Sequence, residues 1–209
     1  MKIKFSKMHG LGNDFMLIDA INQQVNLSAA QIRSMADRHF GVGFDQLLLV
    51  ERPRQTDAEF QYRIFNSDGG EVEQCGNGAR CFARFVVDHG LTQNSEILVD
   101  TNSGRIRLQL MDDGQVRVDM GQPVFEPAQI PLQLNPSIRY KIELKQEVIE
   151  FGAVSIGNPH MVILVDDVSQ ARVQALGAVL EKHPVFPQRA NIGFMQVLNR
   201  EQIKLRVFE

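Results

Sequence analysis

A cysteine followed by two closely spaced glycines is the feature of this sequence that points most directly to chemistry. Cys75 precedes Gly76, Asn77 and Gly78, and an apolar segment follows. A thiol at a helix start lies beside unpaired backbone N–H groups and the positive end of the helix dipole, which lower its pKa. The glycines leave those N–H groups open to a carboxylate. A thiolate beside a carboxylate-binding turn suits removal of the α-proton of an amino acid.

The alternative is that Cys75 is a small residue at a helix start and that the glycines only shape the turn. The glycine-rich setting favours the chemical interpretation for Cys75. For Cys81 we expect packing, because it lies within the apolar part of the same segment.

The segment that follows Cys75 is predicted to be a helix buried on nearly all sides. Arg80, Arg84 and Asp88 recur every four residues and form one polar stripe, and the rest of the helix is apolar. Segments 59–65, 96–100, 105–110 and 115–120 have the pattern of strands. We therefore expect an α+β fold in which a curved sheet wraps around one central helix.

The chain repeats itself. A Gly-Asn pair, a helical segment, a Gly-Phe pair and an Arg-containing strand occur in this order in both halves. The first helix is expected from Ser28, with a capping box to Gln31, to Gly41, and the second over 169–182. The Gly-Asn pairs at 12 and 157 lie 145 residues apart, the Gly-Phe pairs at 43 and 193 lie 150 apart, and the arginines at 63 and 206 lie 143 apart. We predict an internal duplication with domains 1–119 and 120–209.

The repeat also predicts a second cysteine. Carrying the offset of 143 forward from Cys75 places its counterpart near residue 218, beyond the 209 residues of the chain. We therefore expect a C-terminally truncated chain, inactive as it stands, whose second domain ends before its own central helix and leaves apolar surface uncovered.

Composition narrows the function classes. The chain is 44% apolar and 22% charged, with a net charge of −3, which gives no reason to expect a nucleic-acid partner. No apolar run approaches the roughly 20 residues that span a bilayer, and no signal peptide begins the chain. Only two cysteines occur, and His, Cys and carboxylates show no metal-ligand spacing. We expect a cytoplasmic, metal-free protein.

At these residues the chain resembles the diaminopimelate epimerases. The resemblance is strongest at 73–81 and extends over the segments 7–15, 41–46, 66–81, 157–160 and 191–194. It implies two pseudosymmetric β-roll or β-barrel-like domains, each around a central helix, with the second incomplete here. It also implies an isomerase that interconverts LL- and meso-diaminopimelate without pyridoxal phosphate or any other cofactor, in the synthesis of lysine and peptidoglycan precursors.

In this family one thiol removes the α-proton and a second thiol returns it on the opposite face, so the resemblance makes Cys75 one catalytic residue. It assigns contacts with the substrate's polar groups to Asn13, Gln46, Asn66, Asn158, Asn191 and Glu209. It assigns the carboxylate to Gly76 and Asn77, and tuning of the thiols to His160 and Glu209. From the residues alone, Asn13 and Asn66 could equally be turn residues.

Three interpretations compete. The first is the diaminopimelate epimerase, with a small-molecule substrate and with a homodimer left open. The second is a racemase or isomerase of the same fold, similar to proline racemases or phenazine isomerases. The third is a non-catalytic binding module that keeps the fold.

Overall fold

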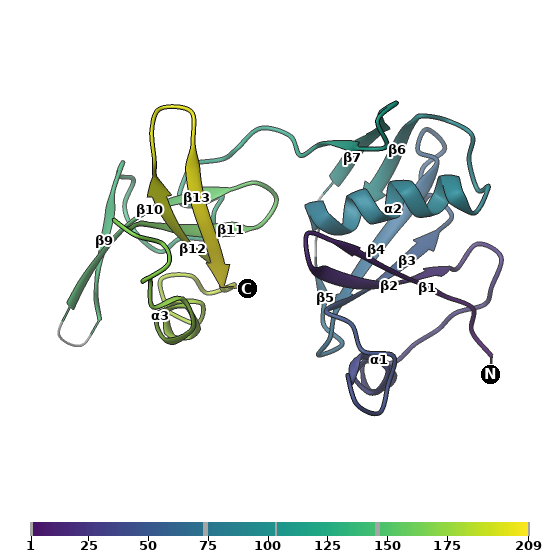
Figure 1. Ribbon diagram of the computed structural model, residues 1–209, viewed down its shortest axis with the longest axis horizontal. Helices are drawn as coiled ribbons and strands as arrows, with labels where there is room; N and C mark the ends of the chain where they lie inside the picture. The colour runs from purple at the N-terminus through teal and green to yellow at the C-terminus, as the bar shows by residue number, and fades with distance from the viewer. Residues whose placement is uncertain (1, 73–74, 103, 145–146, 209) are drawn as a thin grey trace. The chain divides into compact units, whose positions relative to one another are not determined.

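The computed structural model describes residues 2–72, 75–102, 104–144 and 147–208. It divides into two compact units, unit 1 (Met1–Met120) and unit 2 (Gly121–Glu209). Each unit has its own sheet and its own buried core, and each is described by itself (Figure 1).

Unit 1 is a sheet of eight strands in the order β1-β2-β3-β4-β6-β7-β8, with β5 paired to β4, among the described residues. Its elements are β1 (Ser6–Gly10), β2 (Asn13–Asp19), α1 (Ala29–Ala36), β3 (Gln46–Glu51), β4 (Phe60–Asn66), β5 (Glu71–Val72), α2 (Gly76–Asp88), β6 (Glu96–Thr101), β7 (Gly104–Leu110) and β8 (Val116–Asp119). The helix α2 contacts β1 and β2 at one end of the strand order and β7 and β8 at the other, so the sheet curls around it (Figure 1).

The two helices of unit 1 cover opposite faces of the sheet. Side chains alternate between faces along a strand. Phe15, Leu48 and Ile64 pack with Phe82 of α2, whereas Met16, Leu47 and their neighbours pack with α1. The predicted buried helix is confirmed: seven of its residues are buried, Gly78, Ala79, Cys81, Phe82, Ala83, Phe85 and Val86.

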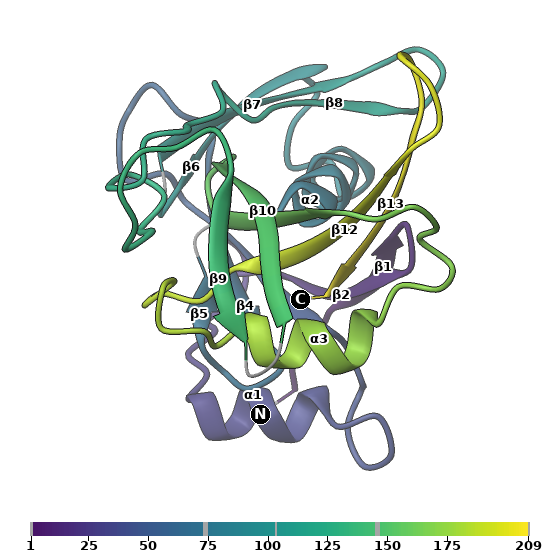
Figure 2. The same ribbon diagram turned by 90° about the vertical axis from the view of Figure 1, so that its left-hand side faces the viewer.

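Over its described residues, unit 2 is a five-stranded sheet, in the order β13-β12-β11-β10-β9, with one helix on one face (Figure 2). Its elements are β9 (Tyr140–Leu144), β10 (Glu147–Ser155), β11 (Pro159–Leu164), α3 (Val173–Leu180), β12 (Asn191–Val197) and β13 (Ile203–Phe208). Val173, Leu176 and Leu180 of α3 are buried against the sheet.

The two units repeat one topology. In unit 1, β1 and β2 are antiparallel, β2 and β3 are parallel with α1 between them in the chain, and β3 and β4 are antiparallel. In unit 2, β10–β11, β11–β12 with α3, and β12–β13 follow the same scheme. Phe15 pairs with Gln46 and His160 with Asn191, and both positions are shifted by 145 residues. This common register supports the predicted duplication, and the α+β fold is confirmed.

Both predicted crossover helices are shorter in the structure. The capping box of Ser28 and Gln31 is present, but α1 ends at Ala36 rather than near Gly41. The carboxylate of Asp37 accepts the backbone N–H groups of His39 and Phe40 at 2.8 and 2.7 Å, which turns the chain out of the helix. The helix α3 begins only at Val173: Ser169 lies in a turn, Gln170 in a bend, and Ala171 and Arg172 have no regular structure.

One face of the sheet in unit 2 is apolar and exposed. Ile203, Leu205 and Val207 of β13 are 54%, 51% and 39% exposed, and they pair with Val197, Met195 and Gly193 of β12. A shift of 143 residues relates them to Phe60, Tyr62 and Ile64, which are buried under α2 in unit 1. The face that α2 covers in unit 1 therefore has an uncovered counterpart in the described part of unit 2.

Candidate functional site

Cys75 is the N-cap residue of α2, as the sequence predicts. Its backbone is extended (φ −144°, ψ 120°), and its carbonyl oxygen accepts the first helical hydrogen bond from Ala79 N–H at 2.8 Å. The N–H groups of the residues between them are the ones that a helix start leaves without an intrahelical acceptor. The thiol and these N–H groups therefore lie at the same end of α2.

One hydrogen bond and close approaches at two glycines place this helix start against the sheet. The buried Tyr62 hydroxyl donates to the Cys75 carbonyl oxygen at 3.3 Å, and a side chain at Gly78 would lie 2.6 Å from that hydroxyl. A side chain at Gly10 would lie 3.2 Å from the Asn77 carbonyl oxygen. Burial raises the pKa of Tyr62 well above its ordinary value, so the hydroxyl keeps its proton and stays a donor.

Three amide side chains lie at the same edge of the sheet. β2 begins at Asn13, the parallel β3 begins at Gln46, and the antiparallel β4 ends at Asn66. Alternation along each strand places all three on the face that α2 covers, since Phe15, Leu48 and Ile64 lie two residues away and belong to the core under α2. Gln46 Nε2 donates to Asn66 Oδ1 at 2.8 Å, so the two side chains are in direct contact.

Two amide oxygens at this edge lack donors. Among the described residues, no donor reaches the buried side-chain oxygens of Asn13 and Gln46. A buried acceptor without a partner costs free energy, so such atoms indicate a place where a ligand supplies the donors. The side chain of Asn77 differs, because its oxygen accepts a hydrogen bond from Arg80.

Unit 2 carries the counterpart of this edge. Asn158, His160 and Asn191 occupy the positions that a shift of 145 residues relates to Asn13, Phe15 and Gln46. His160 Nε2 donates to Asn158 Oδ1 at 2.8 Å. Burial lowers the pKa of His160, which favours the neutral ring at pH 7. Glu209 lies outside the described residues.

The two cysteines have different surroundings. Cys75 is partly buried, whereas Cys81 is 5% exposed within the core of unit 1. Burial raises the pKa of Cys81 to about 11, which keeps it a thiol and agrees with its predicted packing role. The sequence did not single out Tyr62, because a tyrosine within a strand has no special pattern and its contact with Cys75 arises only in the folded sheet.

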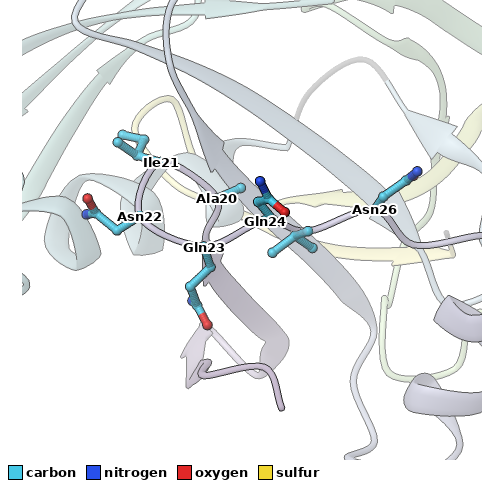
Figure 3. Close-up of a pocket in the computed structure, with 7 residues that line it drawn as sticks. Ala20, Ile21, Asn22, Gln23, Gln24 and Asn26 are labelled. Carbon is cyan, nitrogen blue, oxygen red and sulfur yellow. The ribbon is translucent and has the colours of Figure 1, made fainter. Parts of the chain in front are cut away.

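A surface hollow lies elsewhere in the described part of the chain. It is lined by residues 20–26, in the loop that follows β2 (Figure 3). Asn13 begins β2 and Asp19 ends it, so this hollow and the amide edge lie at opposite ends of one strand. No three His, Cys, Asp or Glu side chains within the described ranges are grouped to hold a metal ion, and no helix there is long and apolar enough to cross a membrane.

Comparison with known proteins identifies the family. The model of the family described as diaminopimelate epimerase matches residues 5–126 and 152–209, which include the amide edge, Cys75 and the counterpart edge of unit 2. The chain belongs to the diaminopimelate epimerase family. It is 56% identical to the diaminopimelate epimerase of Nitrosomonas europaea and 54% identical to that of Ectopseudomonas mendocina. In both cases the match covers 100% of this chain and 76% of the relative.

Solved structures support the same fold. A hydroxyproline epimerase from Agrobacterium vitis aligns with a TM-score of 0.67 at 15% identity, covering 97% of this chain and 68% of that one. A phenazine biosynthesis protein of the PhzF family from Bacillus anthracis aligns with a TM-score of 0.59 at 17% identity, covering 100% and 73%. At such identities these structures show the fold alone. The membership in the epimerase family makes the chain an isomerase by class, as predicted.

Proposed function

We propose that the protein interconverts LL- and meso-diaminopimelate without a cofactor and that Cys75 serves one face of the substrate's α-carbon. The position of Cys75 is the observation that carries this proposal. It caps α2 directly before Gly76, Asn77 and Gly78, beside an edge where two buried amide oxygens lack donors. The 54–56% identity with curated diaminopimelate epimerases favours this substrate over those of the proline racemases and phenazine isomerases.

The reaction follows from this arrangement. The Cys75 thiolate takes the α-proton, so the C–H bond breaks, an S–H bond forms and the electron pair moves onto the α-carbon and its carboxylate. The N–H groups at the start of α2 stabilise the charge that develops on that carboxylate. Gly76 leaves room for this approach, because among the described residues beyond its chain neighbours a side chain there would meet only Met120, at 3.6 Å.

The second proton donor is proposed to be a thiol in a second helix start, near residue 218. Inversion needs a base on one face of the α-carbon and an acid on the other. The exposed apolar face formed by Ile203, Leu205 and Val207 supports the proposal of a second helix, because the corresponding face of unit 1 packs against α2. His160 and Glu209 are proposed to tune the thiols, and Asn13, Gln46, Asn66, Asn158 and Asn191 to bind the substrate's polar groups.

The test uses the protein expressed from its complete coding sequence, assayed in buffer without added cofactor. LL-diaminopimelate, L-proline and trans-4-hydroxy-L-proline are incubated separately, and the stereoisomers are resolved by chiral chromatography. We expect conversion of diaminopimelate alone. Conversion of a proline substrate would favour a relative of the same fold, and conversion of none would favour a non-catalytic module.

A further inference from the structure

A cluster of charged side chains lies on the other face of the sheet, directly behind the amide edge. Asp14 follows Asn13 at the start of β2, and Asp45 precedes Gln46 at the start of β3. Because side chains alternate along a strand, the two carboxylates lie on the face opposite to the two amides. Arg38, which follows the end of α1, contacts both carboxylates.

Hydrogen bonds connect every member of this cluster to Asp14 or Asp45. Arg38 Nη2 donates to Asp14 Oδ1 at 2.8 Å and to Asp45 Oδ1 at 2.7 Å, and its Nη1 donates to Asp14 Oδ2 at 3.2 Å. Asp14 N–H donates to Asp45 Oδ2 at 2.9 Å, and Asp45 N–H donates to Asp14 Oδ1 at 3.0 Å. Lys7 of β1 donates to Asp14 Oδ2 and to the Gly43 carbonyl oxygen. One cluster thus connects β1, β2, the loop after α1 and β3.

The shape of the Arg38 guanidinium explains how it can fix the positions of Asp14 and Asp45. Its planar fork holds two carboxylates in fixed directions, whereas an ammonium group acts as a point charge with rotatable donors. The Arg38 contact is the main cause that lowers the pKa of Asp14 below its ordinary value, and Lys7 adds to it. Arg38 itself is 56% exposed and lies on the face away from α2, so it can act on a ligand only through the strands.

We infer that Arg38 is a positioning residue, which holds the starts of β2 and β3 so that the Asn13 and Gln46 side-chain oxygens meet a ligand's donors. This inference rests on the proposed function. The pairing of β2 with β3 begins at Phe15 and Gln46, so Asn13 and Asp14 precede the first pair, and the cluster connects Asp14 to Asp45 at this end. Without the Arg38 contacts the paired strands and the Asp14–Asp45 contacts would remain, but one constraint on the distance between the Asn13 and Gln46 side chains would be lost.

The test compares Arg38→Gln with Arg84→Gln in the protein expressed from its complete coding sequence. Arg84 is the matched control, since it pairs with Asp88 at 3.0 Å, is 50% exposed and lies near the opposite end of α2 from Cys75. Steady-state epimerisation of diaminopimelate gives KM and kcat, and protection of Cys75 from iodoacetamide by diaminopimelate gives binding without turnover.

We expect Arg38→Gln to raise KM and the half-protecting concentration by about tenfold, with kcat changed less than about twofold, because misplaced binding groups weaken ground-state and transition-state binding alike. Arg38→Lys should recover part of the loss, and Arg84→Gln should match wild type. An active wild type with the same KM in Arg38→Gln would overturn the inference alone. No turnover of diaminopimelate by wild type would overturn the proposed function and this inference with it.

Discussion

Replacing Gly78 with alanine is expected to push the start of α2 away from the sheet, and removing the Tyr62 hydroxyl is expected to relieve the strain. The new methyl group would lie 2.6 Å from the Tyr62 hydroxyl oxygen and 3.4 Å from Leu48 and Phe15. Tyr62 cannot swing aside, because it is 1% exposed and packs edge-on against Phe82 at 5.2 Å between ring centroids. The clash therefore falls on the helix that carries Cys75.

The magnitudes follow from this geometry. Overpacking a core by one methyl group costs about 1–3 kcal/mol, and exchanging glycine for alanine within a helix returns about 1 kcal/mol. The net loss in Gly78→Ala should be about 0–2 kcal/mol. Tyr62→Phe removes one hydrogen bond, worth about 1 kcal/mol, and the Cys75 carbonyl oxygen keeps its bond from Ala79 N–H at 2.8 Å. In the double variant the nearest atoms are those at 3.4 Å, so the clash is absent and this variant should be about 1 kcal/mol more stable than Tyr62→Phe.

The assay is urea unfolding followed by far-ultraviolet circular dichroism, with the free energy of unfolding extrapolated to water. We expect the two changes to be non-additive by about 1–3 kcal/mol, compared with the roughly 0.3–0.5 kcal/mol scatter of independent sites. Tyr140→Phe, in the core of unit 2, is the matched control and should add to Gly78→Ala without coupling. Additive losses for Gly78 and Tyr62 would refute the close approach of hydroxyl and helix.

Three further outcomes are expected. Gly76→Ala should leave the free energy of unfolding within about 0.5 kcal/mol of wild type, because the nearest described atom that the methyl group meets outside its chain neighbours belongs to Met120, at 3.6 Å. The same variant should have a higher KM, because the methyl group obstructs the carboxylate; an unchanged KM would argue against a carboxylate there. Mass spectrometry after iodoacetamide at pH 8 should show Cys75 modified at least about tenfold faster than Cys81, whose pKa is about 11, and equal rates would contradict the assigned burial. The His160 ring should titrate below its ordinary 6.5 in an NMR experiment. The unfolded chain then has the higher pKa at this residue, so protonation of His160 favours unfolding. The contribution of neutral His160 to the free energy of unfolding is therefore complete above about pH 6.5 and declines as the pH falls below that value. A titration midpoint above 6.5 would reverse the sign of this pH dependence.

The repeated Gly-Asn and Gly-Phe pairs predicted much of the fold because they occur where the backbone must take a particular geometry. The glycines at 12 and 157 both have positive φ, at 92° and 101°, and both belong to the turn between the first two strands of the repeat. Few residues other than glycine adopt a positive φ, so the same glycine occurs in both halves and the duplication can be recognised in the sequence. The helix start at Cys75 was predictable for the same reason, since a glycine-rich turn before an apolar segment indicates a helix boundary.

The charged cluster behind the site was not predictable. Lys7, Asp14, Arg38 and Asp45 are ordinary surface residues in the sequence, and no local spacing joins them. They meet because β2 and β3 are parallel and lie side by side, which depends on long-range pairing. The early end of α1 was missed for a related reason, because the side chain of Asp37 bonds to the two following N–H groups and this local turn outweighs the helical pattern.

Isotope exchange at the substrate's α-carbon tests the central claim most directly. The protein expressed from its complete coding sequence is incubated with LL-diaminopimelate in D2O, and α-deuterium is followed by mass spectrometry for wild type, Cys75→Ser and Cys81→Ser. Wild type and Cys81→Ser should incorporate deuterium at similar rates, and Cys75→Ser should lose at least about 100-fold in rate, as expected for a group that transfers the proton. Undiminished exchange in Cys75→Ser, or none in wild type, would contradict the assignment of Cys75 as the acid–base residue of this protein.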